Sequence, residues 1–456
     1  MDLRASSEAR SLGLKLILVG ALAFLLWIPA MLVYALIWDR STRADEVKTE
    51  IYQLAGGRQT ISGPIILAPG VIDTGKTDKD GAAITRTTVV AFTPQTLSID
   101  APTKTSVRRR SIYEATIFDA DIVMKGRFGA LKAPRPAEGV LSIDWDRAVL
   151  AVKFSSGAGL KGVREALQLK LNGRPVRAAF EPGFDTLRGL DEGPGTASFY
   201  ATGISAALPI DNPQNGFSFE LALPLSGGGA LYFAPVGEQT SVSIKADWPD
   251  PSFQGAYLPD TRKITDKGFS AQWRIPYLAR GLPRSFVAQG NLDILDQGKS
   301  FGVEFIATAS PYQSVSRALK YALMFLGIVF LTFFLFEATM GARAHPAQYI
   351  LLGATQVIFY LLVLAFSEHI GFGPAFALTA GATVLLTGYY AATVFRSLLH
   401  GLIAFTAFSG AYGLIYLLMK SEDYALLIGS VTAFGAIALT MFITRNLDWY
   451  GARIKE

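Results

Sequence analysis

The stretch Leu16–Trp38, LILVGALAFLLWIPAMLVYALIW, is an unbroken apolar run that follows a basic leader and ends at Asp39. A helix of about 20 apolar residues crosses the hydrocarbon core of a bilayer. The run is too long for the apolar region of a cleaved signal peptide, and no small-x-small cleavage pattern closes it. It therefore predicts an uncleaved signal anchor, the first transmembrane helix, over 16–38, preceded by a short segment over 1–15.

Five further apolar runs crowd the last third of the chain, and short connectors separate them. They are Tyr321–Phe336, Ala347–Phe366, Phe372–Phe395, Leu398–Met419 and Tyr424–Ile443. Short connectors favour antiparallel neighbours. We expect a bundle of five transmembrane helices over 318–444, a tail over 445–456, and six transmembrane helices in all. A mean hydropathy of +0.33 fits this class of protein.

The orientation follows from Lys and Arg in the short flanking segments, because cytoplasmic loops are enriched in them. With the N-terminus inside, the cytoplasmic side carries Arg4, Arg10, Lys15, Arg343, Arg396, Arg445, Arg453 and Lys455. The two short outside loops carry only Lys420. We expect both termini in the cytoplasm and the long polar segment between the first two apolar runs to be exported.

The exported segment begins with alternating charges, and Val47, Ile51 and Leu54 recur at helical spacing. This pattern predicts an amphipathic stalk helix over 39–57 that Gly56-Gly57 ends. Short runs of alternating or β-branched residues follow, with turn residues between them at Gly63-Pro64 and elsewhere. Asn172-Gly173 predicts a type I′ hairpin. Residues 58–317 are therefore expected to form an all-β, sandwich-like domain, which makes the chain an α+β membrane protein.

Few residue types for catalysis are available in the exported segment. The chain has no cysteine, and its three histidines, His345, His369 and His400, all lie among the C-terminal runs. Thiolate chemistry, Ser-His-Asp catalysis and His-ligated zinc are thereby excluded from the exported domain. Asp119 and Asp121 share one face of a predicted strand, where a solvated surface is the favoured reading. We expect no catalytic residue, cofactor or metal, and the near balance of charge argues against nucleic acid.

Polar residues inside the predicted bundle form two stripes. Gly353, Gln356 and Tyr360 share one helix face, and Thr379, Thr383, Thr387 and Tyr390 share another. Stripes of small and hydroxyl residues usually mark a helix-packing seam. The Gln356 amide would be costly if it were left unpaired in lipid. Gln356 and Tyr360 therefore form a candidate intramembrane polar site, and both a packing seam and a path for a substrate remain open.

Two connectors at the predicted outer interface form a second candidate site. Glu368 and His369 lie in one connector, and Glu422 and Asp423 lie in the other. Polar caps on helix ends are the simpler reading, and a docking patch between the domain and the bundle is the alternative. In the exported domain, Trp248, Pro249 and Phe253 belong to the segment WPDPSF, whose rings anchor either into the β core or against a partner.

Many segments of the chain resemble the CreD family of bacterial inner-membrane proteins. They are Ile28-Pro29, 40–50, 59–64, 110–114, 126–128, 247–255, 320–322, 345–349, 367–372 and 422–427. Ala68-Pro69-Gly70 departs from the family pattern. The resemblance implies a multi-pass protein of the Gram-negative inner membrane with a part in cell-envelope integrity, whose expression is tied to the CreB–CreC two-component system and the response to β-lactams. It supplies no catalytic residue or ligand.

Three functions are consistent with these observations. The first is a non-enzymatic envelope protein whose β domain, on the periplasmic side of the lipid bilayer, binds a periplasmic protein, lipid or peptidoglycan-linked partner. The second is a carrier or permease component for an envelope lipid or amphiphile, with its path along Gln356. The third, an intramembrane enzyme that uses Glu368 and His369, has the least support. The sequence leaves the oligomeric state open.

Overall fold

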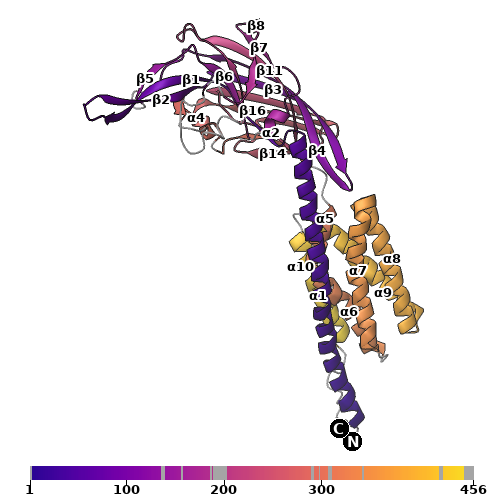
Figure 1. Ribbon diagram of the computed structural model, residues 1–456. Coiled ribbons are helices and arrows are strands. Elements are labelled where there is room, and N and C mark those ends of the chain that lie inside the picture. The colour runs from indigo at the N-terminus through magenta and orange to yellow at the C-terminus, as the bar shows by residue number, and fades with distance from the viewer. Residues whose placement is uncertain are drawn as a thin grey trace. The chain divides into compact units, whose positions relative to one another are not determined.

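The computed structural model describes residues 3–134, 139–155, 158–184, 187, 203–288, 292–296, 298–306, 311–340, 344–420 and 425–445. It divides into a helical unit, residues 1–45 and 309–456, and a β domain, residues 46–308. An apolar N-terminal helix, a region of two β-sheets and five apolar C-terminal helices make this an α+β membrane protein, as the sequence predicts (Figure 1).

The described helices contribute to both units. They are α1 (Leu3–Leu54), α2 (Ala158–Lys161), α4 (Tyr277–Arg280), α5 (Pro311–Lys320), α6 (Ala322–Met340), α7 (Pro346–Ile370), α8 (Phe372–Val394), α9 (Leu398–Lys420) and α10 (Ala425–Thr444), with a 3-10 turn, η3, at Asp293–Leu295. Among these, 5 helices are long and apolar enough to cross a membrane, and α5 with α6 forms a further pair bent by 54°.

The first helix extends beyond its apolar run: α1 continues without a break into the predicted stalk. In the helical unit its buried residues recur about every 3.5 positions, at Val19, Ala23, Leu26, Ala30, Val33 and Ile37. This spacing places the buried residues in one continuous packing stripe along the helix. At Gly353 of α7 a side chain would collide with Leu26, so a glycine is what allows these two helices to approach closely.

The stalk part of α1 packs within the β domain. Val47 and Ile51 are buried against Ala115 of β4 (Tyr113–Phe128), whereas Leu54 is exposed. Only two of the three residues in the predicted apolar stripe therefore find a partner. Arg110 and Glu50 add an ion pair at 2.5 Å. The helix ends as expected, since Gly56 and Gly57 both adopt positive φ angles.

The first sheet of the β domain is built on one long strand, β1 (Gln59–Thr77), which pairs with four others. It runs parallel to β12 (Ala230–Phe233) and antiparallel to β2 (Ala83–Phe92), β5 (Val140–Ile143) and β6 (Val149–Phe154). The turn predicted at Gly63-Pro64 is wrong, because both residues lie inside β1, where the pairing with β6 shifts register. The remaining strands are β9 (Phe180–Pro182), β10 (Gly203–Ala207), β14 (Pro251–Gly255), β17 (Ser285–Ala288) and β18 (Phe301–Phe305).

The second sheet has 8 strands in the order β15-β16-β13-β3-β4-β11-β7-β8. Besides β4 they are β3 (Thr96–Arg110), β7 (Gln168–Leu171), β8 (Arg174–Val176), β11 (Phe217–Gly228), β13 (Gln239–Ala246), β15 (Thr261–Thr265) and β16 (Gly268–Ile275). The hairpin of β7 and β8 is confirmed, with Asn172 and Gly173 at φ angles of 47° and 78°. Both central residues of a type I′ turn require positive φ.

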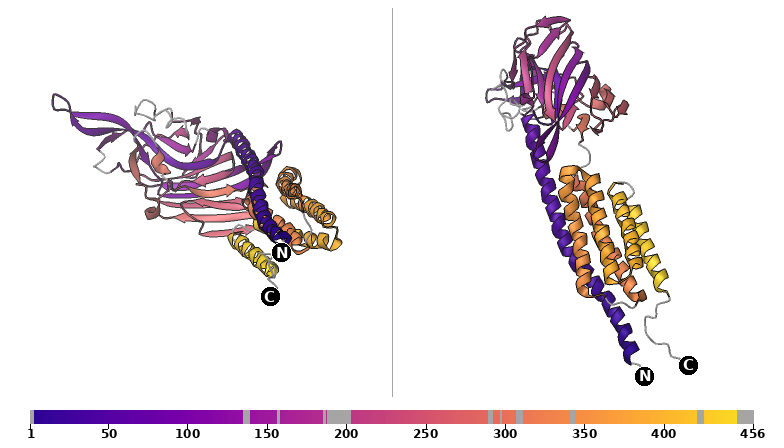
Figure 2. Two further views of the ribbon diagram at one scale, coloured as in Figure 1. Left: turned by 90° about the horizontal axis from the view of Figure 1, so that it is seen from below. Right: turned by 90° about the vertical axis from the view of Figure 1, so that its right-hand side faces the viewer.

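The core of the β domain lies between the two sheets, which form two layers in Figure 2. The strand β3 shows why, because its residues alternate between buried and exposed from Thr96 to Lys104. One face of each strand therefore contributes to the core, and the other face remains outside. Trp273, Phe118 and Phe301 are among the largest fully buried side chains. The outer face of the second sheet is polar, and it carries the first candidate site.

Candidate functional site

A row of polar side chains crosses the outer face of the second sheet at one register level. Arg274 of β16 lies opposite Ser241 of β13, which lies opposite Ser98 of β3, which lies opposite Lys125 of β4. The pairing then continues through Glu220 of β11 to Lys170 of β7. Side chains directly opposite one another on neighbouring strands are close enough to interact. These six residues are called the cross-strand row below.

A groove of about 720 Å³ lies over one end of this row. Its polar lining includes Ser98, Ser241, Thr96 and Gln239, and Lys125 and Arg274 stand at its two sides. The three strand spacings from β16 to β4, at about 4.8 Å each, place these two cations about 14 Å apart at the backbone. The polar part of the groove is thus a strip of hydroxyl and amide groups between two basic side chains, and Leu97, Ile275 and Pro276 supply the apolar part of the lining.

Each of these basic side chains already has an acidic neighbour. Arg274 Nε lies 3.5 Å from Asp260 Oδ2, and Lys125 Nζ lies 3.1 Å from Glu220 Oε2. Lys170 Nζ contacts the same carboxylate at 2.8 Å. Hydrogen bonds from Lys170 and then Lys125 lower the pKa of Glu220, so it is ionised at neutral pH. The charges are therefore paired locally, and the groove is suited to a neutral, hydrogen-bonding ligand more than to a strongly charged one.

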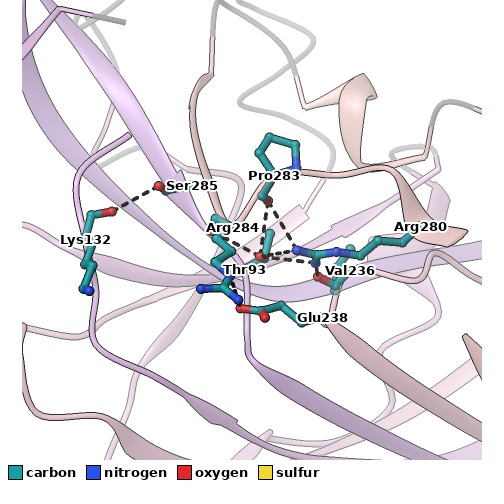
Figure 3. A network of polar contacts seen from close by, with 8 residues as sticks. All are labelled: Thr93, Lys132, Val236, Glu238, Arg280, Pro283, Arg284 and Ser285. Atoms are coloured by element: carbon teal, nitrogen blue, oxygen red, sulfur yellow. Dashed lines mark hydrogen bonds and ion pairs between the residues drawn. The ribbon is translucent and has the colours of Figure 1, made fainter. Parts of the chain in front are cut away.

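The end of the groove is held by a buried arginine, Arg280 of α4 (Figure 3). Its guanidinium donates to the Val236 carbonyl, to Thr93 Oγ1 at 3.2 Å and to the Pro283 carbonyl at 3.4 Å. These acceptors belong to three separate segments, after β2, before β13 and before β17. A planar guanidinium with donors in a fixed fork is suited to joining several acceptors in this way. We call this network the Arg280 clasp.

The segments joined by the clasp lead directly into the groove. Thr93 comes just before Thr96 of β3, and Val236 comes just before Gln239 of β13. Backbone hydrogen bonds tie the same segments together, from the Glu238 amide to the Pro94 carbonyl at 2.9 Å and from the Thr93 amide to the Arg284 carbonyl at 2.9 Å. The clasp therefore fixes the starts of two groove strands relative to each other.

Charge also contributes to the clasp. Desolvation lowers the pKa of Arg280 to about 10, and the nearby Glu238 carboxylate opposes that shift. Arg280 is therefore still a cation at neutral pH. Glu238 Oε1 lies 3.1 Å from Arg284 Nε, and the ring of Tyr277 lies beneath both guanidinium groups, 5.2 Å from the Arg280 carbon and 5.7 Å from the Arg284 carbon. No sequence signal singles out Arg280, because a lone arginine before a glycine is indistinguishable from a surface residue.

The two residues of the predicted intramembrane site, Gln356 and Tyr360, are both buried on α7. Tyr412 of α9 donates to Gln356 Oε1 of α7 at 2.5 Å. Gln356 Nε2 and the Tyr360 hydroxyl are buried and have no hydrogen-bond partner among the described residues. Each buried unsatisfied polar group costs about 1–3 kcal/mol. Tyr412 also lines a hollow of about 350 Å³ between α8 and α9, with Ala380, Gly381 and Gly413 among its walls.

The threonine stripe of α8 has a local explanation. The hydroxyls of Thr379, Thr383 and Thr387 each donate to the carbonyl four residues earlier, at 2.8, 2.8 and 2.7 Å. Such bonds satisfy a hydroxyl inside its own helix. Near the end of α6, Glu337 carries a buried carboxylate that accepts a hydrogen bond from the Tyr349 hydroxyl at 3.2 Å.

The predicted junction is described only in part, because Glu422 and Asp423 lie outside the described residues. Glu368, near the end of α7, accepts a hydrogen bond from the Tyr312 hydroxyl at 2.9 Å and lies 4.0 Å from Arg40 Nη1. His369 is exposed beside it. Glu368 thus links α7 to α5 and α1, a structural role within the helical unit.

The aromatic residues of the WPDPSF segment lie against the β core. Trp248 donates its indole N–H to the Ile306 carbonyl at 3.0 Å. Phe253 makes edge contacts with Phe269 at 5.6 Å and Trp273 at 5.8 Å, while Pro249 is exposed. Asp119 and Asp121 lie on the outer face of β4, where both approach Arg164. Among the described residues, no group of three or more His, Cys, Asp or Glu side chains could hold a metal ion.

The fold defines a multi-pass membrane protein with one large β domain inserted after its first helix. Comparison with known proteins specifies the family: the model "Inner membrane protein CreD" matches residues 11–450. The chain is also 31% identical over 435 residues to "Inner membrane protein CreD" of Escherichia coli (strain K12), covering 95% of this chain and 92% of that protein. The chain belongs to the CreD family, which places it in the inner membrane.

Solved structures add little. A mutant M1 zinc metallopeptidase with a bound tripeptide substrate, from Deinococcus radiodurans, overlaps 80% of this chain and 95% of its own at 11% identity and a TM-score of 0.20. Another structure of an M1 zinc metallopeptidase from that organism overlaps 80% of this chain and 96% of its own at 10% identity and a TM-score of 0.21. Overlap at this level carries no argument about fold or activity.

The Arg280 clasp yields the first testable prediction. Replacing Arg280 with Met leaves three acceptors without their donor and should lower the stability of the β domain by about 3 kcal/mol. Hydrogen exchange should rise in 93–96, 234–239 and 281–285 more than in the rest of the sheet. The matched control is Arg274→Met, whose side chain is 80% exposed and whose loss should cost less than about 0.5 kcal/mol. Equal stability of the two variants would contradict a role for the clasp.

Proposed function

We propose that this inner-membrane protein contributes to cell-envelope integrity by binding an envelope partner, without catalysis, through the groove on its β domain. The observation that carries the proposal is the groove over one end of the cross-strand row, where serine and threonine hydroxyls and the Gln239 amide lie between charged groups that are already paired. An extended ligand rich in hydroxyl and amide groups complements such a surface. Glycan and peptide segments of peptidoglycan have this chemistry.

The absence of histidine and cysteine from the β domain supports binding over catalysis. General bases with a pKa near neutrality are most often histidines, and thiolate nucleophiles require cysteine. One ion pair, Arg274 with Asp260, lines the groove, and Lys125 at its side pairs with Glu220. Neither pair places a nucleophile beside a base. A binding role accounts for its residues without a reaction.

The proposal requires the β domain to face the periplasm, and the bias of Lys and Arg toward the opposite side supports that orientation. Because the chain has no cysteine, a single introduced thiol reports its own side of the membrane. Ser98→Cys should be labelled by a membrane-impermeant maleimide in cells with a permeabilised outer membrane. Arg396→Cys, in the connector between α8 and α9, should be labelled only after the inner membrane is lysed. The reverse pattern would contradict this orientation.

Filling the groove tests the binding function. Ser98→Trp places a large ring on an exposed position of β3 that lines the groove, so the fold should be preserved. The full chain in detergent should bind soluble disaccharide-peptide fragments of peptidoglycan, and this variant should bind them at least about tenfold more weakly. Ser106→Trp lies on the same outer face of β3 but outside the groove, and it should bind as the parent chain does. The proposal fails if the fragments do not bind, or if both variants behave alike.

A second function, a carrier for an envelope lipid or amphiphile, is supported by the unpaired groups Gln356 Nε2 and Tyr360 hydroxyl. A buried polar group without a hydrogen-bond partner lowers the stability of the protein, so its presence requires an explanation. A hydrogen bond to a polar group of a bound ligand would provide one. The hollow beside Tyr412 offers a largely apolar surface on which part of an acyl chain could lie next to these groups.

The stability of variants separates this carrier function from simple packing. Tyr360→Phe removes an unpaired hydroxyl, so it should raise stability in detergent by about 1 kcal/mol. If the site carries a substrate, Tyr360→Phe and Gln356→Leu should both fail to complement an envelope defect in cells while their protein levels persist. Tyr389→Phe, whose ring is 72% exposed on α8, is the control. Normal complementation by both site variants would rule out the carrier.

A further inference from the structure

A small hollow of about 220 Å³ lies between two segments of the helical unit, α1 and α5. Tyr34, Trp38 and Ser41 line it from α1, and Ser316, Arg317 and Lys320 are among the residues that line it from α5. Ligand pockets for whole drug-sized molecules are about 300–1,000 Å³. The hollow is therefore large enough for a small polar group but not for a molecule with long chains.

The hollow lies at the level where the membrane meets water. On α1 the apolar run ends at Trp38, and Asp39 and Arg40 follow at once. Trp and Tyr are enriched at this level of a membrane, where their rings lie among the lipid headgroups. The helix α5 is bent by 54° from α6 and presents polar and basic residues before the apolar span begins. Both walls of the hollow thus change from apolar to polar at the same depth.

The lining of the hollow has the chemistry of an anion site. The Arg317 guanidinium supplies a fork of donors, the Lys320 ammonium supplies a point charge, and the Ser41 and Ser316 hydroxyls can donate further hydrogen bonds. None of the described residues that line the hollow is acidic. The acid on the adjoining helix end, Glu368, already accepts from Tyr312 at 2.9 Å and lies 4.0 Å from Arg40 Nη1.

We propose that this hollow binds the phosphate headgroup of an anionic phospholipid from the surrounding bilayer. The phosphate lies between Arg317 and Lys320, and the glycerol and the start of the acyl chains lie along Tyr34 and Trp38. A guanidinium fork and an ammonium group both make charge-assisted hydrogen bonds to phosphate oxygens. Inorganic phosphate shares the charged group but lacks the apolar part, which the two aromatic side chains would contact. The site is separate from the groove of the β domain and does not depend on the function proposed for it.

The test compares lipids that differ only in the headgroup. The full chain is stripped of lipid in a neutral detergent, then titrated with phosphatidylglycerol or phosphatidylcholine of the same acyl chains, and bound lipids are counted by native mass spectrometry. The parent chain should retain phosphatidylglycerol in preference. Arg317→Gln with Lys320→Gln removes both charges that would contact the phosphate, so it should lose at least about tenfold in apparent affinity for phosphatidylglycerol.

Two further double variants serve as controls for a general effect of charge. Arg262→Gln with Lys263→Gln removes the same charges from β15, where both side chains are exposed, and should leave the affinity unchanged. Arg317→Lys with Lys320→Arg keeps both charges and should retain most of the preference for phosphatidylglycerol. Equal retention of the two lipids, or no loss in the double Gln variant, would overturn the proposal. So would competition by millimolar inorganic phosphate that displaces the lipid completely, because the site would then recognise phosphate without its lipid.

Discussion

A bilayer offers no hydrogen-bond partner to the backbone, and the architecture of this protein depends on that constraint. In hydrocarbon every N–H and C=O must be satisfied inside the protein, which a helix achieves within a single segment. The apolar runs therefore become helices, and the chain can form sheets only in the polar stretch between the first and second runs. The continuous helix α1 belongs to both environments, with a buried stripe in the helical unit and Val47 and Ile51 packed inside the β domain.

In the β domain a second constraint applies, the alternation of side chains along a strand. Alternate residues of β3 enter the core, which leaves Thr96 and Ser98 on the outside. Cross-strand pairing then aligns outward residues from six strands into one row. The groove therefore results from the register of the paired strands. The Arg280 clasp fixes the starts of β3 and β13, two of the strands that line it. Without cysteine, the domain relies on its core and on networks of this kind for its rigidity.

The buried polar groups of the two units differ in how well they are satisfied. Arg280 gives its guanidinium hydrogens to acceptors in three segments, with only Nε unpaired. Inside the bundle, the threonine hydroxyls of α8 are satisfied by their own helix, whereas Gln356 Nε2 and the Tyr360 hydroxyl have no partner among the described residues. A satisfied network specifies a structure, and an unsatisfied one reduces stability unless a ligand or water completes it. By this criterion Arg280 has a structural role, whereas Gln356 and Tyr360 form a candidate binding site.

The sequence by itself determined the membrane class, the order of helical and β regions, the family and the Asn172-Gly173 hairpin, because hydropathy and turn chemistry are local properties. It also identified Gln356 and Tyr360, since polar residues stand out within an apolar run. Only the tertiary structure decided that Gly63-Pro64 lies within β1 and that Leu54 is left exposed. It also decided that Ser98 and Lys125 line one groove and that Arg280 joins the segments that lead into it. Those facts depend on register and on contacts between residues far apart in the chain, for which the local pattern of apolar and polar residues contains no information.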